Sequence, residues 1–312
     1  MNIFERTRLP LLVAPMFLVS SPELVIASAR SGVIGALPAA NARTVETLDE
    51  WLAHIHAALH PEQLPWLFNM IVHSSYDRFD AELDLVRRYQ PAVVTTALGS
   101  PARVTDTVKA YGGKVFADVI TPTMAKKSIA AGVDGLILVC SGAGGHTGKY
   151  NPLAFINHVR EFWDGPLGIA GCVSRGQDVL AMQAAGADFV VVGTRFIAAC
   201  ESLASDEYRN MLVASGLEDI VETTAVSGVN ATWMKASLEQ AGIDPNSPVA
   251  AKAIDFSGNI STANKAWKDV WSAGQGVGAT REVTTAGHII DELHAEYVAT
   301  LKKMKDLSEG YL

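Results

Sequence analysis

Short apolar runs recur along the chain, with room for a helix between each pair. Eight of them stand out, at residues 11–15, 33–37, 66–72, 92–98, 114–119, 135–140, 166–172 and 188–193. A strand with one solvated face alternates apolar and polar residues, whereas these runs are almost continuously apolar. Such runs are typical of a parallel sheet that helices cover. The pattern therefore predicts eight buried strands.

The stretches between these runs carry the periodicity of helices. Apolar residues fall three or four positions apart in two of them, which are Leu48, Leu52, Ile55 and Leu59 in one, and Phe79, Leu83 and Val86 in the other. That spacing places one apolar stripe along a helix. Eight β units joined by helical crossovers favour an α/β fold of the (β/α)8 TIM barrel type over a doubly wound sheet.

The βα rhythm breaks after Thr194. We expect residues 1–200 to form the barrel, and residues 201–271 to form a mainly helical substrate or lid subdomain without a clear strand, inserted after strand eight. Residues 272–312 should return to the barrel as a final helix. Its apolar stripe, which should pack on the barrel, consists of Ile290, Leu293, Tyr297 and Leu301.

Composition narrows the class of protein. The chain has 312 residues, 49% of them hydrophobic, and a net charge of −8, which argues against non-specific nucleic-acid binding. The three cysteines, Cys140, Cys172 and Cys200, have no C-x-x-C spacing, so we expect neither a disulfide framework nor a metal site. No apolar run approaches the ~20 residues that span a bilayer, and no signal peptide is recognisable. These features predict a soluble cytoplasmic protein. They leave homo-oligomer formation open.

The strongest candidate for chemistry is a glycine-rich loop after the sixth apolar run. Gly144, Gly145 and Gly148 surround His146. Glycines let the backbone approach a flat or anionic ligand, and an imidazole can exchange a proton near neutral pH. In a barrel of this type the site lies at the carboxyl ends of the strands, where this loop begins. The alternative is a loop histidine that only hydrogen-bonds to backbone.

Two further glycines follow neighbouring strands. Gly171 ends the seventh apolar run and Gly193 the eighth, and a predicted helix begins shortly after each. Backbone N–H groups and helix N-termini at this point form the phosphate site common in TIM barrels. The alternative is that both glycines only permit tight turns. A Walker A loop is excluded, because Ala143 stands where its first glycine belongs and Tyr150 where its hydroxyl belongs.

Four segments, taken in order, resemble one family. They are Ala14-Pro15-Met16, Gly144-Gly145-His146-Thr147-Gly148, Ala170-Gly171-Cys172-Val173-Ser174-Arg175-Gly176 and the stretch 186–196 that contains Gly193-Thr194. This set is similar to the FMN-dependent nitronate monooxygenases, formerly called 2-nitropropane dioxygenases. Enoyl-ACP reductase II and the NADH:quinone reductases are relatives of that family. The segment 271–276, with Gln275, also resembles a late family element near the flavin.

The resemblance implies an FMN cofactor and a residue-by-residue site. The residues that match cofactor-binding positions are Ala14, Pro15, Met16, Asn69, Asp118, Gly144, Gly145, Ala170, Gly171, Cys172, Gly193, Thr194 and Gln275. His146 matches the family's active-site histidine. By the same resemblance, Ala14 to Met16, Asn69, Gly144 and Gly145 lie by the flavin ring, while Gly171, Cys172, Gly193 and Thr194 hold its phosphate.

The chain departs from the family pattern at three positions. Cys172 stands where a second glycine is frequent, and Gly142 where an acidic residue is frequent. Some reductase relatives carry a lysine on the fifth strand near the flavin, and Asp118 takes that position here. A cation there would stabilise reduced, anionic flavin. The choice of electron donor is therefore open.

Three functions remain. The first is oxidation of an alkyl nitronate by O2, with His146 removing the α-proton of a neutral nitroalkane or holding the nitro oxygens. The second is an NAD(P)H-dependent flavin reductase that acts on a quinone, an enoyl thioester or a similar small acceptor. The third, ranked below both, is a flavin-free barrel that binds a phosphorylated metabolite at Gly171 and Gly193.

Overall fold

Eight parallel strands form a closed barrel, as the sequence predicts. The computed structural model describes residues 3–62, 64–247 and 270–310. The strands lie in the order β1-β9-β8-β6-β5-β4-β3-β2, and a parallel bridge between Leu12 and Ile34 joins the two ends of the sheet. Their bounds are β1 Leu11–Val13, β2 Gly35–Pro38, β3 Trp66–Ile71, β4 Val93–Ala97, β5 Lys114–Val119, β6 Gly135–Val139, β8 Leu167–Ala170 and β9 Phe189–Val192.

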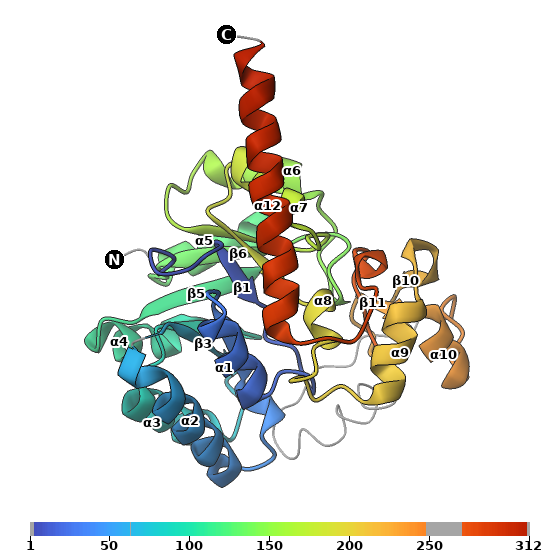
Figure 1. Ribbon diagram of the computed structural model, residues 1–312. Coiled ribbons are helices and arrows are strands. Elements are labelled where there is room, and N and C mark those ends of the chain that lie inside the picture. The colour runs from blue at the N-terminus through green and yellow to red at the C-terminus, as the bar shows by residue number, and fades with distance from the viewer. Residues whose placement is uncertain (1–2, 63, 248–269, 311–312) are drawn as a thin grey trace.

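Helices alternate with these strands and surround them (Figure 1). Their bounds are α1 Pro22–Arg30, α2 Val45–Leu59, α3 Phe79–Tyr89, α4 Ala102–Ala110, α5 Pro122–Ala130, α6 Pro152–Arg160, α7 Gly176–Ala184 and α8 Thr194–Ile197. Three more follow after the barrel, α9 Asp206–Ala214, α10 Lys235–Gln240 and α12 Ala286–Glu309. Several begin with a side-chain cap that satisfies a backbone N–H, as Thr44 does for α2 and Ser21 for α1. Both predicted apolar stripes are buried, on α2 and α3.

A layer of apolar side chains fills the interior of the barrel. The strands contribute Leu12, Ala36, Leu67, Val93, Phe116, Ile137, Phe189 and Val191, all buried, together with Ile34 just before β2. The fit is close at Gly168 of β8, where a Cβ would lie 2.2 Å from the ring of Phe189. The barrel is therefore a packed core, and ligands reach it only from an end.

The segment after the barrel is not simply helical. Strands β10, Ile220–Thr223, and β11, Ala231–Met234, pair antiparallel there, and β11 pairs with the two-residue strand β7, Gly145–His146. Our expectation of a mainly helical segment 201–271 without a strand was wrong in this respect. Its residues 248–269 lie outside the described residues. The error arose because these strands are short and alternate only weakly.

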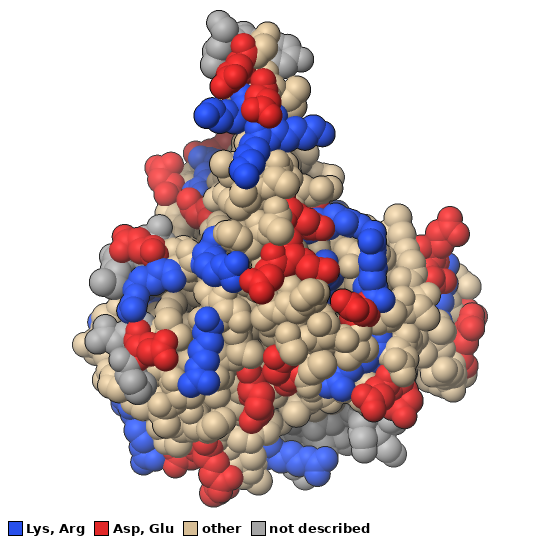
Figure 2. Space-filling model, viewed as in Figure 1, with Lys and Arg blue, Asp and Glu red and all other residues tan. Residues whose placement is uncertain are grey.

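The final helix α12 packs against α7 and α1. Ile290 and Leu293 are fully buried, as the predicted stripe requires, but Leu301 is 44% exposed, so the stripe outruns the barrel. Figure 1 shows the end of α12 projecting beyond the body. On the face in Figure 2, basic and acidic side chains are interspersed, without a one-signed patch. Within the described ranges, no helix combines the length and apolar character needed to cross a bilayer.

Candidate active site

The loops after β1 and β9 pack against each other at the carboxyl end of the barrel. The Ala14 N–H donates to the carbonyl of Val192 at 2.9 Å. A Cβ at Gly193 would lie 3.2 Å from the Cβ of Ala14 and 3.5 Å from the sulfur of Met16. The loop Ala14-Pro15-Met16 and the loop after β9, predicted to belong to one site, are therefore neighbours.

Asn41 holds the first of these loops, and the sequence did not reveal it. Its side-chain oxygen accepts from the Leu18 N–H at 2.8 Å, and its amide donates to the Met16 carbonyl at 3.0 Å. Leu18 has a positive φ of 59°, a conformation that a non-glycine residue adopts only under external constraint. The signal was a polar residue in the short turn after β2, which carries no motif.

The loop after β6 is joined to the segment that contains Gln275. The Gln275 N–H donates to the Gly142 carbonyl at 2.9 Å. A Cβ at Gly144 would lie 2.8 Å from the Gly274 nitrogen, so only glycine allows this approach. Thr147 folds the loop back by donating from its hydroxyl to the Cys140 carbonyl at 3.1 Å.

His146 is held by backbone pairing with the inserted segment. In the β7–β11 pair, His146 lies opposite Ala231, and the Thr147 N–H donates to the Asn230 carbonyl at 3.3 Å. The residue remains accessible to solvent, yet burial of its ring lowers the pKa of His146. The neutral imidazole therefore predominates at neutral pH and can accept a proton.

The loop after β8 carries two residues with positive φ. Gly171 has a φ of 113° and Cys172 one of 62°. The Cys172 thiol lies 3.3 Å from the Ser141 carbonyl, to which it donates. The residue as a whole is exposed. Burial of its sulfur, together with the charge of Asp178, raises the pKa of Cys172, so the thiol stays protonated.

Two of the departures from the family pattern compensate for each other in space. A Cβ at Gly142 would lie 2.3 Å from the Cys172 sulfur and 2.8 Å from the Gln275 side-chain oxygen. The thiol and the Gln275 amide thus occupy the space that a side chain at position 142 would need. A side chain at position 142 would require the Cys172 thiol and the Gln275 side chain to move.

A buried arginine ties the loops after β8 and β9 together. Thr194 accepts from the Gly274 N–H at 2.9 Å. Its neighbour Arg195 is 6% exposed and donates to the Ser174 carbonyl at 3.1 Å and to Glu292 of α12 at 2.5 Å. We did not predict a role for Arg195, because a single arginine after a strand carries no motif of its own.

Three interior positions on adjacent strands are polar. The side chain of Asn69 on β3 donates to the hydroxyl of Thr95 on β4 at 2.9 Å, and Thr95 is fully buried. Asp118 on β5 is half-buried. Asp118 lies near the carboxyl end of β5, the end of the barrel at which the glycine loops lie.

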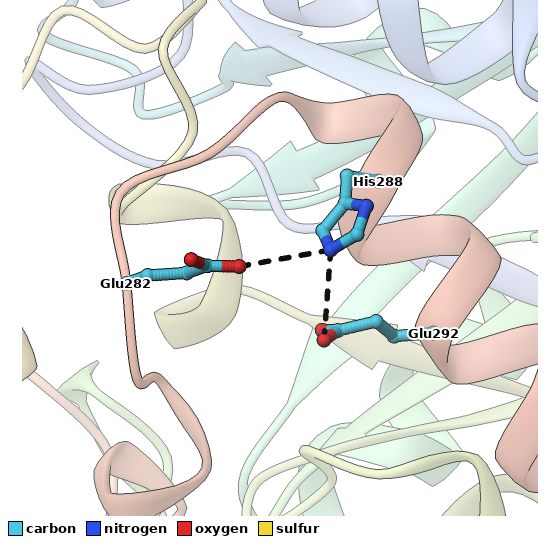
Figure 3. A group of neighbouring side chains, drawn as sticks. All are labelled: Glu282, His288 and Glu292. Atoms are coloured by element: carbon cyan, nitrogen blue, oxygen red, sulfur yellow. Dashed lines mark ion pairs between the residues drawn. The ribbon is translucent and has the colours of Figure 1, made fainter.

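Figure 3 shows a second group of titratable side chains, Glu282, His288 and Glu292, on α12 and in the segment before it. Their candidate ligand atoms lie within 4.8 Å of one another, and all three residues are exposed. The His288 ring is 3.6 Å from Glu282 and 3.7 Å from Glu292. Because Glu292 already pairs with the guanidinium of Arg195, we assign this group to ion pairing.

Comparison with known proteins identifies the family. Residues 56–296 match the sequence profile of the nitronate monooxygenases. The chain belongs to the nitronate monooxygenase family. It is 27% identical to a nitronate monooxygenase of Paraburkholderia phytofirmans, over 96% of this chain and 95% of that one. The family resemblance stated from the sequence is therefore confirmed, and the chain is an oxidoreductase.

Three other proteins extend the comparison. A Rhodococcus jostii protein named (3aS,4S,5R,7aS)-5-hydroxy-7a-methyl-1-oxo-octahydro-1H-indene-4-carboxyl-CoA dehydrogenase is 29% identical, over 75% of this chain and 65% of that one. The crystal structure of nitroalkane oxidase from Streptomyces ansochromogenes has a TM-score of 0.84 at 25% identity, over 97% and 100% of the two chains. FabK from Thermotoga maritima, at 23% identity and a TM-score of 0.79 over 100% of this chain and 98% of that one, shares the fold.

Proposed function

We propose that the protein binds FMN at the carboxyl end of its barrel and oxidises alkyl nitronates with O2. The observation that carries this proposal is the convergence of separate glycine loops and the Gln275 segment beside the loop of His146. Family membership supports the flavin, and the relatives named for nitronates and nitroalkanes support the substrate. We infer that the segment 201–271 forms the substrate side of the site.

The loops after β8 and β9 would accommodate the phosphate end of FMN. A Cβ at Gly171 would lie 3.1–3.3 Å from three backbone atoms of the β6 loop, so a side chain would crowd the space. Gly193 is the N-cap of α8 and lies against Ala14 and Met16 of the loop after β1, while the Thr194 hydroxyl accepts from the Gly274 N–H. Ala170, Gly171, Cys172, Gly193 and Thr194 would hold the phosphate through backbone N–H groups and the Thr194 hydroxyl.

The ring end of the cofactor would meet mostly backbone and small side chains. Ala14, Pro15 and Met16 would pass along it, with Asn69, Asp118, Gly144, Gly145 and Gln275 around its edge. Bound FMN would supply the electron-accepting chemistry, with O2 as the final oxidant. The side chains of the protein would bind the substrate, orient it and move its proton.

His146 would perform the proton step. Its neutral ring nitrogen would take the proton from the carbon next to the nitro group, leaving the negative charge on the nitro oxygens. With a preformed nitronate no proton needs to move, and the same side chain would only orient the substrate. The lowered pKa of His146 supports the base role, since little of it is protonated at neutral pH.

A second candidate function is NAD(P)H-dependent reduction of a quinone, an enoyl thioester or a similar acceptor through the bound flavin. One observation favours it: the Rhodococcus jostii relative acts, by its name, on a CoA thioester. Oxygen uptake separates the two functions. We expect FMN-loaded protein to consume O2 with an alkyl nitronate and to keep its flavin oxidised in an anaerobic NADH titration. Rapid bleaching by NADH, without nitronate turnover, would establish the second function instead.

Replacement of Arg195 by Met should weaken FMN binding by about tenfold. The change removes two hydrogen bonds from a buried guanidinium, and such charged bonds contribute about 1.5–3 kcal/mol each; part of this is recovered because Glu292 is 45% exposed on its side chain. Without them the loops after β8 and β9 lose their common anchor. The dissociation constant is measured from quenching of FMN fluorescence.

Arg8→Met is the matched control for Arg195→Met. Arg8 also pairs with a carboxylate of α12, Asp291, but both side chains are exposed and lie away from the loops of the site. We expect it to bind FMN like the wild type. Equal affinities in Arg195→Met and the wild type would show that the anchor has no part in cofactor binding.

A further inference from the structure

Asp118 is a carboxyl group that the proposed chemistry leaves unexplained. On β5, Phe116 belongs to the layer that fills the barrel, while Ala117 and Val119 pack toward the helices. Side chains alternate along a strand, so Asp118 points to the same interior as Phe116 and lies one step nearer the carboxyl end of the barrel. The carboxyl therefore stands above the apolar layer, on the strand next to Thr95.

Asp118 has no protein partner that would stabilise a negative charge. Among the described residues, none donates a hydrogen bond to its carboxyl or forms an ion pair with it. Burial alone raises the pKa of Asp118 to about 7. An unpaired carboxyl at the top of an apolar core is easier to accommodate as the neutral acid.

The charged groups on the elements around β5 are engaged elsewhere or face outward. Strands β4 and β6 carry no titratable residue. The cations and their partners are Arg103 with the carbonyls of Val72 and His73, Lys109 with the carbonyl of Gly132, Lys126 with the ring of Phe162, and Lys114 with Asp134. Asp106 of α4 and Lys127 of α5 are exposed on the outer faces of these helices. His146, in the loop after β6, is mainly neutral at neutral pH because its pKa is lowered.

We propose that Asp118 binds the flavin as a neutral acid and donates its proton in a hydrogen bond to an acceptor atom of the ring. This inference rests on the proposed function. A flavin ring edge offers carbonyl oxygens and ring nitrogens as acceptors. An ionised carboxylate can only accept hydrogen bonds, whereas the protonated form has an O–H donor. Binding of the ring also removes the remaining water from the carboxyl, which favours the neutral form further.

The consequence is that FMN binding takes up a proton. Above the pKa of the free protein, Asp118 must be protonated for the ring to bind, so affinity falls as pH rises. For a group with a pKa of about 7, the protonated fraction falls about 30-fold between pH 6.0 and pH 8.5. We expect the dissociation constant for riboflavin, which lacks the titrating phosphate of FMN, to rise by about that factor.

Asp118→Asn is the test variant. The Asn side chain keeps the shape of the protonated acid and donates through its NH2 group at every pH. Its dissociation constant for riboflavin at pH 6.0 should stay within about threefold of the wild type and change by less than about threefold up to pH 8.5. Asp106→Asn is the matched control. It changes an exposed aspartate of α4 and should retain the full pH dependence of the wild type.

Several outcomes would overturn this role for Asp118. They are an equal affinity of the wild type for riboflavin at pH 6.0 and pH 8.5, an affinity for riboflavin that rises with pH, or an unchanged pH dependence in Asp118→Asn. If that variant does not fold, proton uptake by the wild type decides. Riboflavin added to weakly buffered protein at pH 8 should take up close to one proton per site, and no uptake contradicts the proposal. Failure of the wild type to bind FMN or riboflavin at any pH refutes the flavin site itself, and is distinct from these results.

Discussion

Replacing His146 by Asn should slow the turnover of a neutral nitroalkane by about 10²–10⁴-fold, the usual contribution of a general base. Turnover of the preformed nitronate should fall only a few-fold, because its proton has already left. The backbone of the loop should survive the change, since the β7–β11 pairing that holds it uses main-chain groups. Both rates are measured as initial oxygen consumption on FMN-loaded protein.

The comparison between the two substrates is the internal control for this variant. His158→Asn provides a second one, because His158 lies on α6 and pairs with Glu161 at the surface, so both rates should match the wild type. Equal losses on nitroalkane and nitronate in His146→Asn would contradict the base role. They would leave His146 as a group that binds the nitro oxygens.

Replacing Gly145 by Val should abolish FMN retention. Gly145 is buried and has a φ of 69°, a region that costs an L-residue roughly 1–2 kcal/mol and a β-branched one more. A branched side chain would also occupy the face on which we expect the flavin ring. The measurement is the ratio of flavin to protein absorbance after gel filtration in the presence of excess FMN.

Gly112→Val separates backbone strain from loss of the ligand. Gly112 has a similar φ of 84°, and nothing lies within 4 Å of the Cβ position. It follows α4 at the opposite end of the barrel from the glycine loops. This variant should pay a comparable conformational cost and still retain FMN. A folded Gly145→Val protein that binds FMN with wild-type affinity would remove that loop from the cofactor site.

The barrel could be predicted from the sequence because burial on both sides of a parallel strand leaves a clear trace. All eight apolar runs overlap a strand, and the stripe of α2 coincides with its buried residues. The stripe of α12 misled at Leu301, which is 44% exposed. An apolar stripe shows which side of a helix can be buried, and says nothing of where the neighbouring surface ends.

The candidate site could be proposed from the sequence where its chemistry depends on residue type, whereas the contacts between distant segments could not be predicted. Glycine loops with a histidine leave a local pattern in the sequence. Other contacts leave no such pattern, because each joins segments far apart in the chain. They are the pairing of His146 with β11, the hydrogen bond of Asn41 to the loop after β1, and the hydrogen bond of Arg195 to the loop after β8. Nor could the sequence reveal that Gly142 and Cys172 compete for one space, since this follows from the folded backbone.

One measurement tests the central claim most directly. FMN-loaded protein is mixed without oxygen with an alkyl nitronate, and the oxidised flavin band near ~450 nm is followed over time. If the cofactor accepts electrons from the nitronate, the band should bleach on mixing and return when O2 is admitted. A band that stays unchanged with nitronate would contradict the nitronate oxidation proposed for this protein. Protein that remains colourless after incubation with FMN would contradict the flavin site and favour a barrel that binds a phosphorylated metabolite.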